Sequence, residues 1–217
     1  MIIYLSQIII IFIKVSKSLK HKFNMGNSKS SYSNITIINQ FVDAAGKGDE
    51  NTVRSLLLTS KVNINDKNEK GRTALMNASN NNNESMVSLL IDNGADINMK
   101  NNDGWTALLY AAEYCKESLV SLLLDRGSGI NMKNKYGSTA LMYAAINNSE
   151  SMVSFLLIKG ADINMKNNNG YTALMFASEY CKESIVTLLL DKGADFNMKN
   201  NVNIRLNIKF SNLSVIC

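Results

Sequence analysis

A shift of 33 residues aligns the chain with itself, and this repeat constrains the fold more than any other feature of the sequence. Four copies of a Gly-x-Thr-Ala-Leu-x-x-Ala string begin at Gly71, Gly104, Gly137 and Gly170. Fixed offsets then place one Glu, one Val and a second Gly in every copy. Chance does not hold several residue types in one register over four copies, so the chain is built from a repeated structural unit.

Each copy contains two short apolar blocks with helical spacing, such as Ala74 to Ala78 and Met86 to Ile91. Neither block is long enough to form a stable helix alone, so the units must stack to bury their apolar sides. The periodic Glu begins the second block, where it favours the helix dipole, and the second Gly follows it, where a left-handed C-cap is needed. A threonine precedes each first block, where its hydroxyl can cap the helix: Thr73, Thr106, Thr139 and Thr172.

The repeated strings resemble the ankyrin repeat. Gly71-Arg-Thr-Ala-Leu-Met-Asn-Ala78 is similar to the family's Gly-x-Thr-Pro-Leu-His-x-Ala, and Val186 to Asn197 is similar to its Val-x-Leu-Leu-Leu-x-x-Gly-Ala-Asp-x-Asn. The resemblance implies an all-α ankyrin-repeat solenoid of stacked helix-turn-helix units with protruding turns. We predict an apolar, then basic N-terminal segment outside the fold (1–34), a degenerate capping repeat (35–67), four full repeats (68–199) and a degenerate C-terminal tail (200–217).

In the tail, apolar residues from Val202 to Phe210 alternate with polar ones, which is the period of a strand. The tail either covers the last repeat in an extended form or marks the chain as a truncated or frame-shifted remnant of a longer array, and the second interpretation is favoured. One alternative to a binding function is therefore that the chain is a non-functional remnant.

Three positions depart from the family pattern. The family's Pro is Ala in all four repeats, which keeps a good helix former and loses only rigidity. The family's His is replaced by Met or Leu, which predicts looser turns: Met76, Leu109, Met142 and Met175. The family's Gly between the two helices is replaced by Asn82, Cys115, Asn148 and Cys181. Asn tolerates a left-handed backbone better than Cys does, so two of these four turns are expected to be strained.

Charge and chemistry exclude most other functions. Five lysines and no acidic residue lie before residue 35, which leaves 18 basic and 18 acidic residues in the repeat body, so no nucleic-acid partner is predicted. His21 is the only histidine, and the three cysteines contain no CxxC pair, which predicts neither a disulfide framework nor a zinc site. We therefore predict no enzyme activity, no catalytic or metal site and no cofactor, and a cytoplasmic protein.

The family resemblance implies that another protein binds the concave surface formed by the turn tips and the exposed side of each first helix. The residue after the turn Gly varies most between copies, as expected of a recognition position, and exposed Trp, Tyr and Arg dominate binding hot spots. The predicted partner-binding residues are Arg72, Trp105, Tyr114, Tyr136, Ser138, Tyr171 and Tyr180. The alternative is that the aromatic ones only pack on neighbouring repeats, as we expect of Tyr110, Tyr143 and Phe176. The predicted protein is a monomeric scaffold or adaptor.

A lysine ladder at Lys100, Lys133, Lys166 and Lys199 has two interpretations, an anion-binding stripe or a solvated face of the turns. The second is favoured because an Asp precedes three of these lysines by four residues.

The N-terminal segment offers a second functional hypothesis, a membrane-recruited adaptor. The apolar run from Ile2 to Ile13 is too short to span a bilayer comfortably and lacks the features of a signal peptide. Met25-Gly26-Asn27-Ser28-Lys29-Ser30 matches the N-myristoylation pattern if translation starts at Met25, with Gly26 as the acylated residue.

Overall fold

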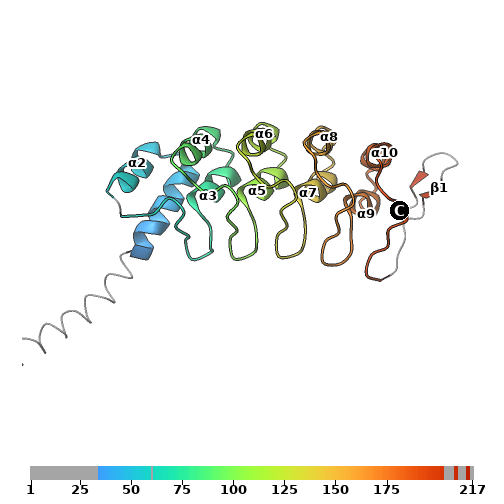
Figure 1. Cartoon of the computed structure of the whole chain (residues 1–217), viewed down its shortest axis with the longest axis horizontal. Helices are drawn as coiled ribbons and strands as arrows, with labels where there is room; N and C mark the ends of the chain where they lie inside the picture. Colours follow the sequence, from blue (N-terminus) through green and yellow to red (C-terminus); the bar gives the residue numbers. More distant parts are fainter. Residues whose placement is uncertain (1–33, 60, 203–207, 210–213, 216–217) are drawn as a thin grey trace, which may run out of the picture.

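The computed structural model describes residues 34–59, 61–202, 208–209 and 214–215. Paired helices follow one another along the array and are joined by long turns (Figure 1). After a helix that covers the described residues 34–47, the elements are α2 (Glu50–Leu58), α3 (Ala74–Asn80), α4 (Glu84–Asp92), α5 (Ala107–Glu113), α6 (Glu117–Asp125), α7 (Ala140–Ile146), α8 (Glu150–Ile158), α9 (Ala173–Glu179), α10 (Glu183–Asp191), β1 (Ile208–Lys209) and β2 (Ser214–Val215).

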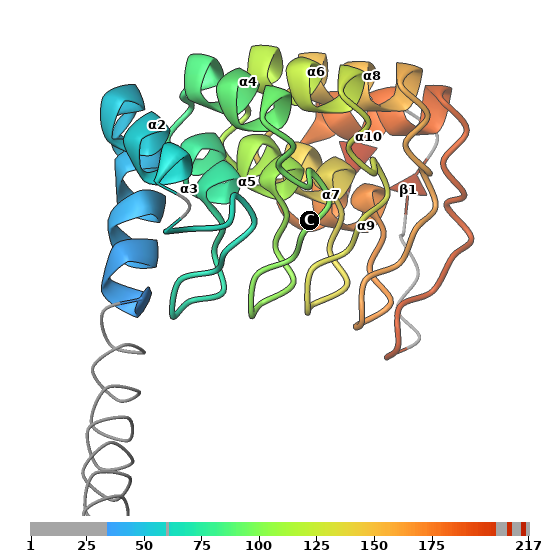
Figure 2. The ribbon, with the colours of Figure 1, turned by 60° about the vertical axis from the view of Figure 1, so that its left-hand side comes forward.

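The helices form two rows. The outer row holds α2, α4, α6, α8 and α10, the inner row holds α3, α5, α7 and α9, and the long turns project from the inner row as a fringe (Figures 1 and 2). Every unit takes an equivalent place along the stack, which confirms the predicted all-α solenoid of helix-turn-helix units with protruding turns.

One continuous apolar core runs through the stack. It extends from Phe41 in the first helix to Ala194 after the last, and the inner helices pack in sequence, α3 on α5, α5 on α7 and α7 on α9. Small residues such as Ala78 and Ala111 are fully buried between them, which allows close approach of the helices. Each unit therefore completes the interior of its neighbours, and the stability of the array comes largely from these interfaces.

The predicted helix signals operate as expected. Each inner helix begins after a threonine whose hydroxyl accepts a hydrogen bond from the backbone N–H three residues on, at 3.3 Å for Thr73 and 3.2 Å for Thr106. Each outer helix begins at the periodic Glu. After α4, the N–H of Gly94 bonds to the carbonyl of Ile91 and the N–H of Ala95 to that of Leu90, which is a Schellman C-cap with Gly94 at φ 88°.

The interhelix turns contain the predicted left-handed residues. Asn82 and Asn148 have φ of 57° and 58°, and Cys115 and Cys181 have φ of 50° and 53°. A left-handed backbone is costly for a Cys residue because its Cβ crowds the following carbonyl oxygen. The expectation of strain in these two turns is therefore supported.

The structure describes the degenerate first repeat and part of the C-terminal tail. The two apolar blocks expected in the degenerate first repeat lie in helices, with Phe41 and Val53 fully buried. At the other end, β1 and β2 pair antiparallel, with Ile208 opposite Val215. Most of the alternating tail lies outside the described residues, as does the whole of residues 1–33 with the motif at Gly26.

Candidate binding surface

The turns that border the inner helices are closed by an asparagine at the start of each repeat. The N–H of Asn101 bonds to the carbonyl of Trp105, and the Asn101 side-chain oxygen accepts bonds from the N–H groups of Asp103 and Trp105, all at 2.9 Å. Asn68, Asn134 and Asn167 do the same in their repeats. Looser turns were expected because the family's His is absent. That expectation did not take account of this asparagine, whose 33-residue spacing was visible in the sequence.

Further bonds tie each turn to the next. Three of the four ladder lysines, Lys100, Lys133 and Lys166, donate to the backbone carbonyl of the lysine one repeat on, for example from Lys100 Nζ to the Lys133 oxygen at 2.7 Å. Asparagine side chains also link successive turns. The backbone N–H of Asp96, for example, donates a hydrogen bond to the side-chain oxygen of Asn65 in the preceding repeat, at 2.8 Å. Lys100, Lys133 and Lys166 thus form neither a plain anion stripe nor only a solvated face, because their ammonium groups already have backbone partners.

We call the exposed sides of α3, α5, α7 and α9, together with the adjoining turn residues, the inner surface. Arg72, Trp105 and Tyr171 follow the turn glycines and lie half-buried on this surface. Ser138, at the equivalent place in the third repeat, is only 8% exposed and offers a partner little area.

Aromatic rings form a row of two groups along the inner surface. The Trp105 ring lies between Tyr110 of its own repeat, at 5.1 Å between centroids, and Tyr143 of the next repeat, at 5.0 Å. Tyr171 contacts Phe176 at 5.2 Å. Trp105 and Tyr171 therefore pack on neighbouring rings and still keep part of their surface open, so packing and partner binding are compatible roles for them.

Three tyrosines stand out as exposed. Tyr114 and Tyr180 are each 52% exposed at the C-terminal ends of α5 and α9, and Tyr136 is 57% exposed in a turn. Tyr114 lies four residues after Tyr110, so both project from one side of the helix. The ammonium of Lys135 lies 5.1 Å from the centre of the Tyr136 ring and also pairs with Asp103.

Burial changes the titration of three groups on this surface. The pKa of Tyr110 and that of Tyr143 are raised because burial disfavours the phenolate. Burial also raises the pKa of the Glu113 carboxyl, and the positive charge of Arg72 opposes this effect. Arg72 itself lies over the Tyr110 ring, 4.9 Å from its centre. Arg72 therefore acts on both the ring and the carboxylate.

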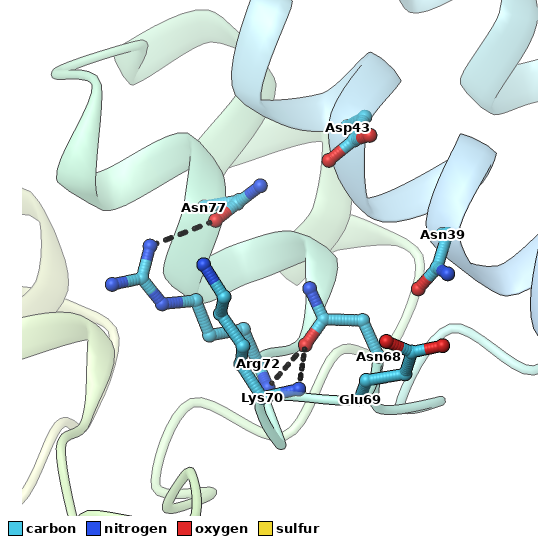
Figure 3. Close-up of a pocket in the computed structure, with 7 residues that line it drawn as sticks. All are labelled: Asn39, Asp43, Asn68, Glu69, Lys70, Arg72 and Asn77. Carbon is cyan, nitrogen blue, oxygen red and sulfur yellow. Dashed lines mark hydrogen bonds between the residues drawn. The ribbon is translucent and has the colours of Figure 1, made fainter.

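A polar hollow lies where the inner surface meets the N-terminal helix (Figure 3). Asn39 and Asp43 of that helix line one side, and Asn68, Glu69, Lys70, Arg72 and Asn77 line the other. The Arg72 guanidinium points toward the Asn77 side-chain oxygen, at 3.5 Å. Only Arg72 of these residues was predicted from the sequence. The spacing of four between Asn39 and Asp43 could have indicated that both face the same side of a helix.

Other kinds of site can be assessed over the part of the chain that the structure describes. There, no three His, Cys, Asp or Glu side chains come together to hold a metal ion. None of the helices there has both the length and the apolar character to cross a bilayer. Cys115 is a free thiol.

Comparison with known families agrees with this geometry. Two overlapping stretches, residues 41–134 and 116–200, match the family model described as "Ankyrin repeats (3 copies)". The stretches together cover well over half of the chain, and no catalytic domain is identified by the comparison. A comparison with curated proteins finds no match.

Proposed function

Because the chain belongs to the ankyrin-repeat family, we propose that it is a scaffold or adaptor that binds another protein through its inner surface. Ankyrin repeats are in general protein–protein interaction modules. The observation that carries the proposal is the aromatic row, in which Trp105 and Tyr171 pack on neighbouring rings while Tyr114, Tyr136 and Tyr180 stay more than half exposed.

This arrangement has the properties of a binding hot spot. Tyr and Trp supply large contact areas, with an apolar ring and a polar tip on the same side chain. Ring stacking and the asparagine-closed turns hold Trp105 in place before any partner arrives, so less conformational entropy is lost on binding. Ser138 contributes shape to the surface and little contact area.

The outer row offers a weaker alternative. Leu58 is 84% exposed and Ile158 78% exposed at the ends of α2 and α8. A hollow lined by Arg54, Leu57 and Leu89 adjoins Leu58. Leu58 and Ile158 lie three repeats apart on separate helices, and single exposed apolar residues are common on soluble proteins.

Affinity capture with matched variants tests the proposal. Tyr114→Ala combined with Tyr180→Ala removes two exposed rings from the inner surface, and Leu58→Ala combined with Ile158→Ala removes comparable apolar area from the outer row. We expect the first pair to reduce capture of a specific partner at least tenfold and the second to leave it unchanged. The Trp105→Ala, Tyr171→Ala pair should reduce capture to a similar extent as the Tyr114→Ala, Tyr180→Ala pair. If capture depends on the outer pair alone, the proposed surface is wrong.

A membrane-recruited adaptor is a second candidate, supported by the motif from Met25 to Ser30. Acylation requires Gly26 to be the N-terminal residue, and one acyl chain gives only marginal membrane binding. Intact-mass measurement of the cellular protein tests it, because a chain that begins at Met1 excludes the modification.

A further inference from the structure

The sequence has a second period of 66 residues, or two repeats, and this period places the same three positions at two points on the inner surface. The first set contains Arg72, Tyr110 and Glu113. A shift of 66 residues gives Ser138, Phe176 and Glu179. Ring and carboxylate are therefore present in both sets, while the cation is present only in the first.

In the first set, the chain itself supplies the cation. The guanidinium carbon of Arg72 lies 4.9 Å from the centre of the Tyr110 ring, and its charge acts on the Glu113 carboxylate. Trp105 contacts the same ring at 5.1 Å, and Tyr110 is left only 5% exposed. Arg72 thus gains from cation–π attraction at close range, and its charge favours the Glu113 carboxylate at longer range.

In the second set, the place of the guanidinium is taken by Ser138, whose side chain is a single hydroxymethyl group. Tyr171 contacts the Phe176 ring at 5.2 Å, as Trp105 does for Tyr110, but Phe176 stays half-buried. Glu179 is exposed, and no hydrogen bond or salt bridge reaches its carboxylate from the rest of the described chain. The second set thus keeps the ring and the carboxylate without the cation.

We propose that Phe176, Glu179 and Tyr180 form a subsite for an arginine side chain of the partner protein, which would lie over the Phe176 ring as Arg72 lies over the Tyr110 ring. The inference rests on the proposed function. A guanidinium is favoured over an ammonium because its flat face can stack on Phe176 while its N–H groups bond to the Glu179 carboxylate. Tyr180, 52% exposed and four residues after Phe176, can add a second ring beside the bound side chain.

The junction between the second and third repeats does not offer the same chemistry. There the residue after the turn Gly is Trp105, which already covers the Tyr143 ring at 5.0 Å. The position equivalent to Glu179 is Ile146. This junction can take apolar groups, and the arginine subsite is specific to the fourth repeat.

The first test fills the subsite from within the chain. Ser138→Arg is compatible with the turn because the same position carries Arg72, Trp105 and Tyr171 in the other repeats. In the full chain, the δ-methylene protons of the new side chain should show an upfield NMR shift from the Phe176 ring current, and Phe176→Leu should remove that shift. If these protons resonate at random-coil positions, the inference is overturned.

The second test uses random dodecapeptides displayed on phage and selected on the full-length protein. Selected peptides should carry an arginine, and their affinity should fall about tenfold in Glu179→Gln and in Ser138→Arg, where the subsite is occupied. Glu150→Gln, which changes an exposed carboxylate on the outer row, is the matched control and should have no effect.

The outcomes separate this inference from the proposed function. Peptides that need Trp105 and Tyr171 but bind Ser138→Arg as well as the unmodified protein overturn the arginine subsite and leave the proposed function intact. Peptides whose affinity is unchanged by the Trp105→Ala, Tyr171→Ala substitutions overturn the proposed function. A lysine-containing peptide that binds as tightly as its arginine counterpart also contradicts the subsite as proposed.

Discussion

The side-chain ammonium of Lys133 lies 2.7 Å from the carbonyl oxygen of Lys166, one repeat further along the array. Equivalent bonds join Lys67 to Lys100, Lys100 to Lys133 and Lys166 to Lys199. The fringe of turns is therefore one connected network and not a set of independent loops. Such a network holds the turn residues of the inner surface at fixed spacings.

Replacing Lys133 with Met should lower the free energy of unfolding by about 1 to 2 kcal/mol, because the aliphatic stem is kept while a charge-assisted hydrogen bond is lost. Urea denaturation measures the change. Lys192→Met is the control, since the Lys192 ammonium is exposed and bonds to no other described residue, and its effect should stay within about 0.5 kcal/mol. Equal effects of both changes would show that the Lys133 bond does not stabilise the array.

Much of the fold could be predicted from the sequence because its signals are local. The capping threonine, the first-turn Glu and the C-cap Gly each act within one helix turn, so their spacing alone located the helices. The links between turns could not be predicted this way. Whether Lys100 reaches the carbonyl of Lys133 depends on the distance between stacked repeats, which no local pattern contains.

The turn glycines and the C-cap glycines should respond differently to Ala, although both have a positive φ. A Cβ at Gly104 would lie 2.7 Å from the backbone nitrogen of Lys135 in the next turn, whereas a Cβ at Gly127 would have nothing within 4 Å. We expect Gly127→Ala to cost about 1 kcal/mol from backbone strain alone. Gly104→Ala should cost roughly 3 kcal/mol, since the turns must also move apart.

Thermal or urea unfolding of these two variants gives the comparison directly. The difference between them isolates the contact between successive turns, because the backbone strain is common to both. Similar losses for the two variants would mean that the turns can separate freely.

From α4 onward, the outer helices alternate between capped and uncapped starts, which predicts that a capping residue at an uncapped start is stabilising. Asn83 and Ser149 cap α4 and α8 with side-chain hydrogen bonds of 3.0 and 3.3 Å, but Lys116 and Lys182 make no such bond at the starts of α6 and α10. Lys116→Asn should raise the stability by about 1 kcal/mol, measured by urea denaturation. Lys116→Gln removes the same charge without supplying a cap, and a gain as large as that of Asn would rule out capping as the cause.

The candidate binding residues could be predicted from the sequence only in part. The variable position after the turn Gly could be identified by comparing the four copies, and this gave Arg72, Trp105 and Tyr171. The contact of Arg72 with Tyr110 joins residues in different repeats and depends on how those repeats stack. The burial of Ser138 reflects a side chain too short to reach the surface from the same backbone position.

The carboxylate of Glu113 should make the stability depend on pH in a direction set by its burial. Its pKa is raised in the folded state, so folding favours the protonated form and ionisation removes stability as the pH rises through the folded pKa. Glu113→Gln should therefore stabilise the protein at pH 7, and the advantage should disappear below about pH 4, where the carboxyl is protonated in both states. Because the Arg72 charge opposes the shift, the gain at pH 7 should be larger when Arg72→Ala is also present. Urea denaturation of the four proteins of this cycle at pH 7 and at low pH measures both effects. The stability of Glu113→Gln relative to the unmodified chain could instead be lower at pH 7 than at low pH. That result would mean that the Glu113 carboxylate is stabilised by its surroundings and not penalised by burial.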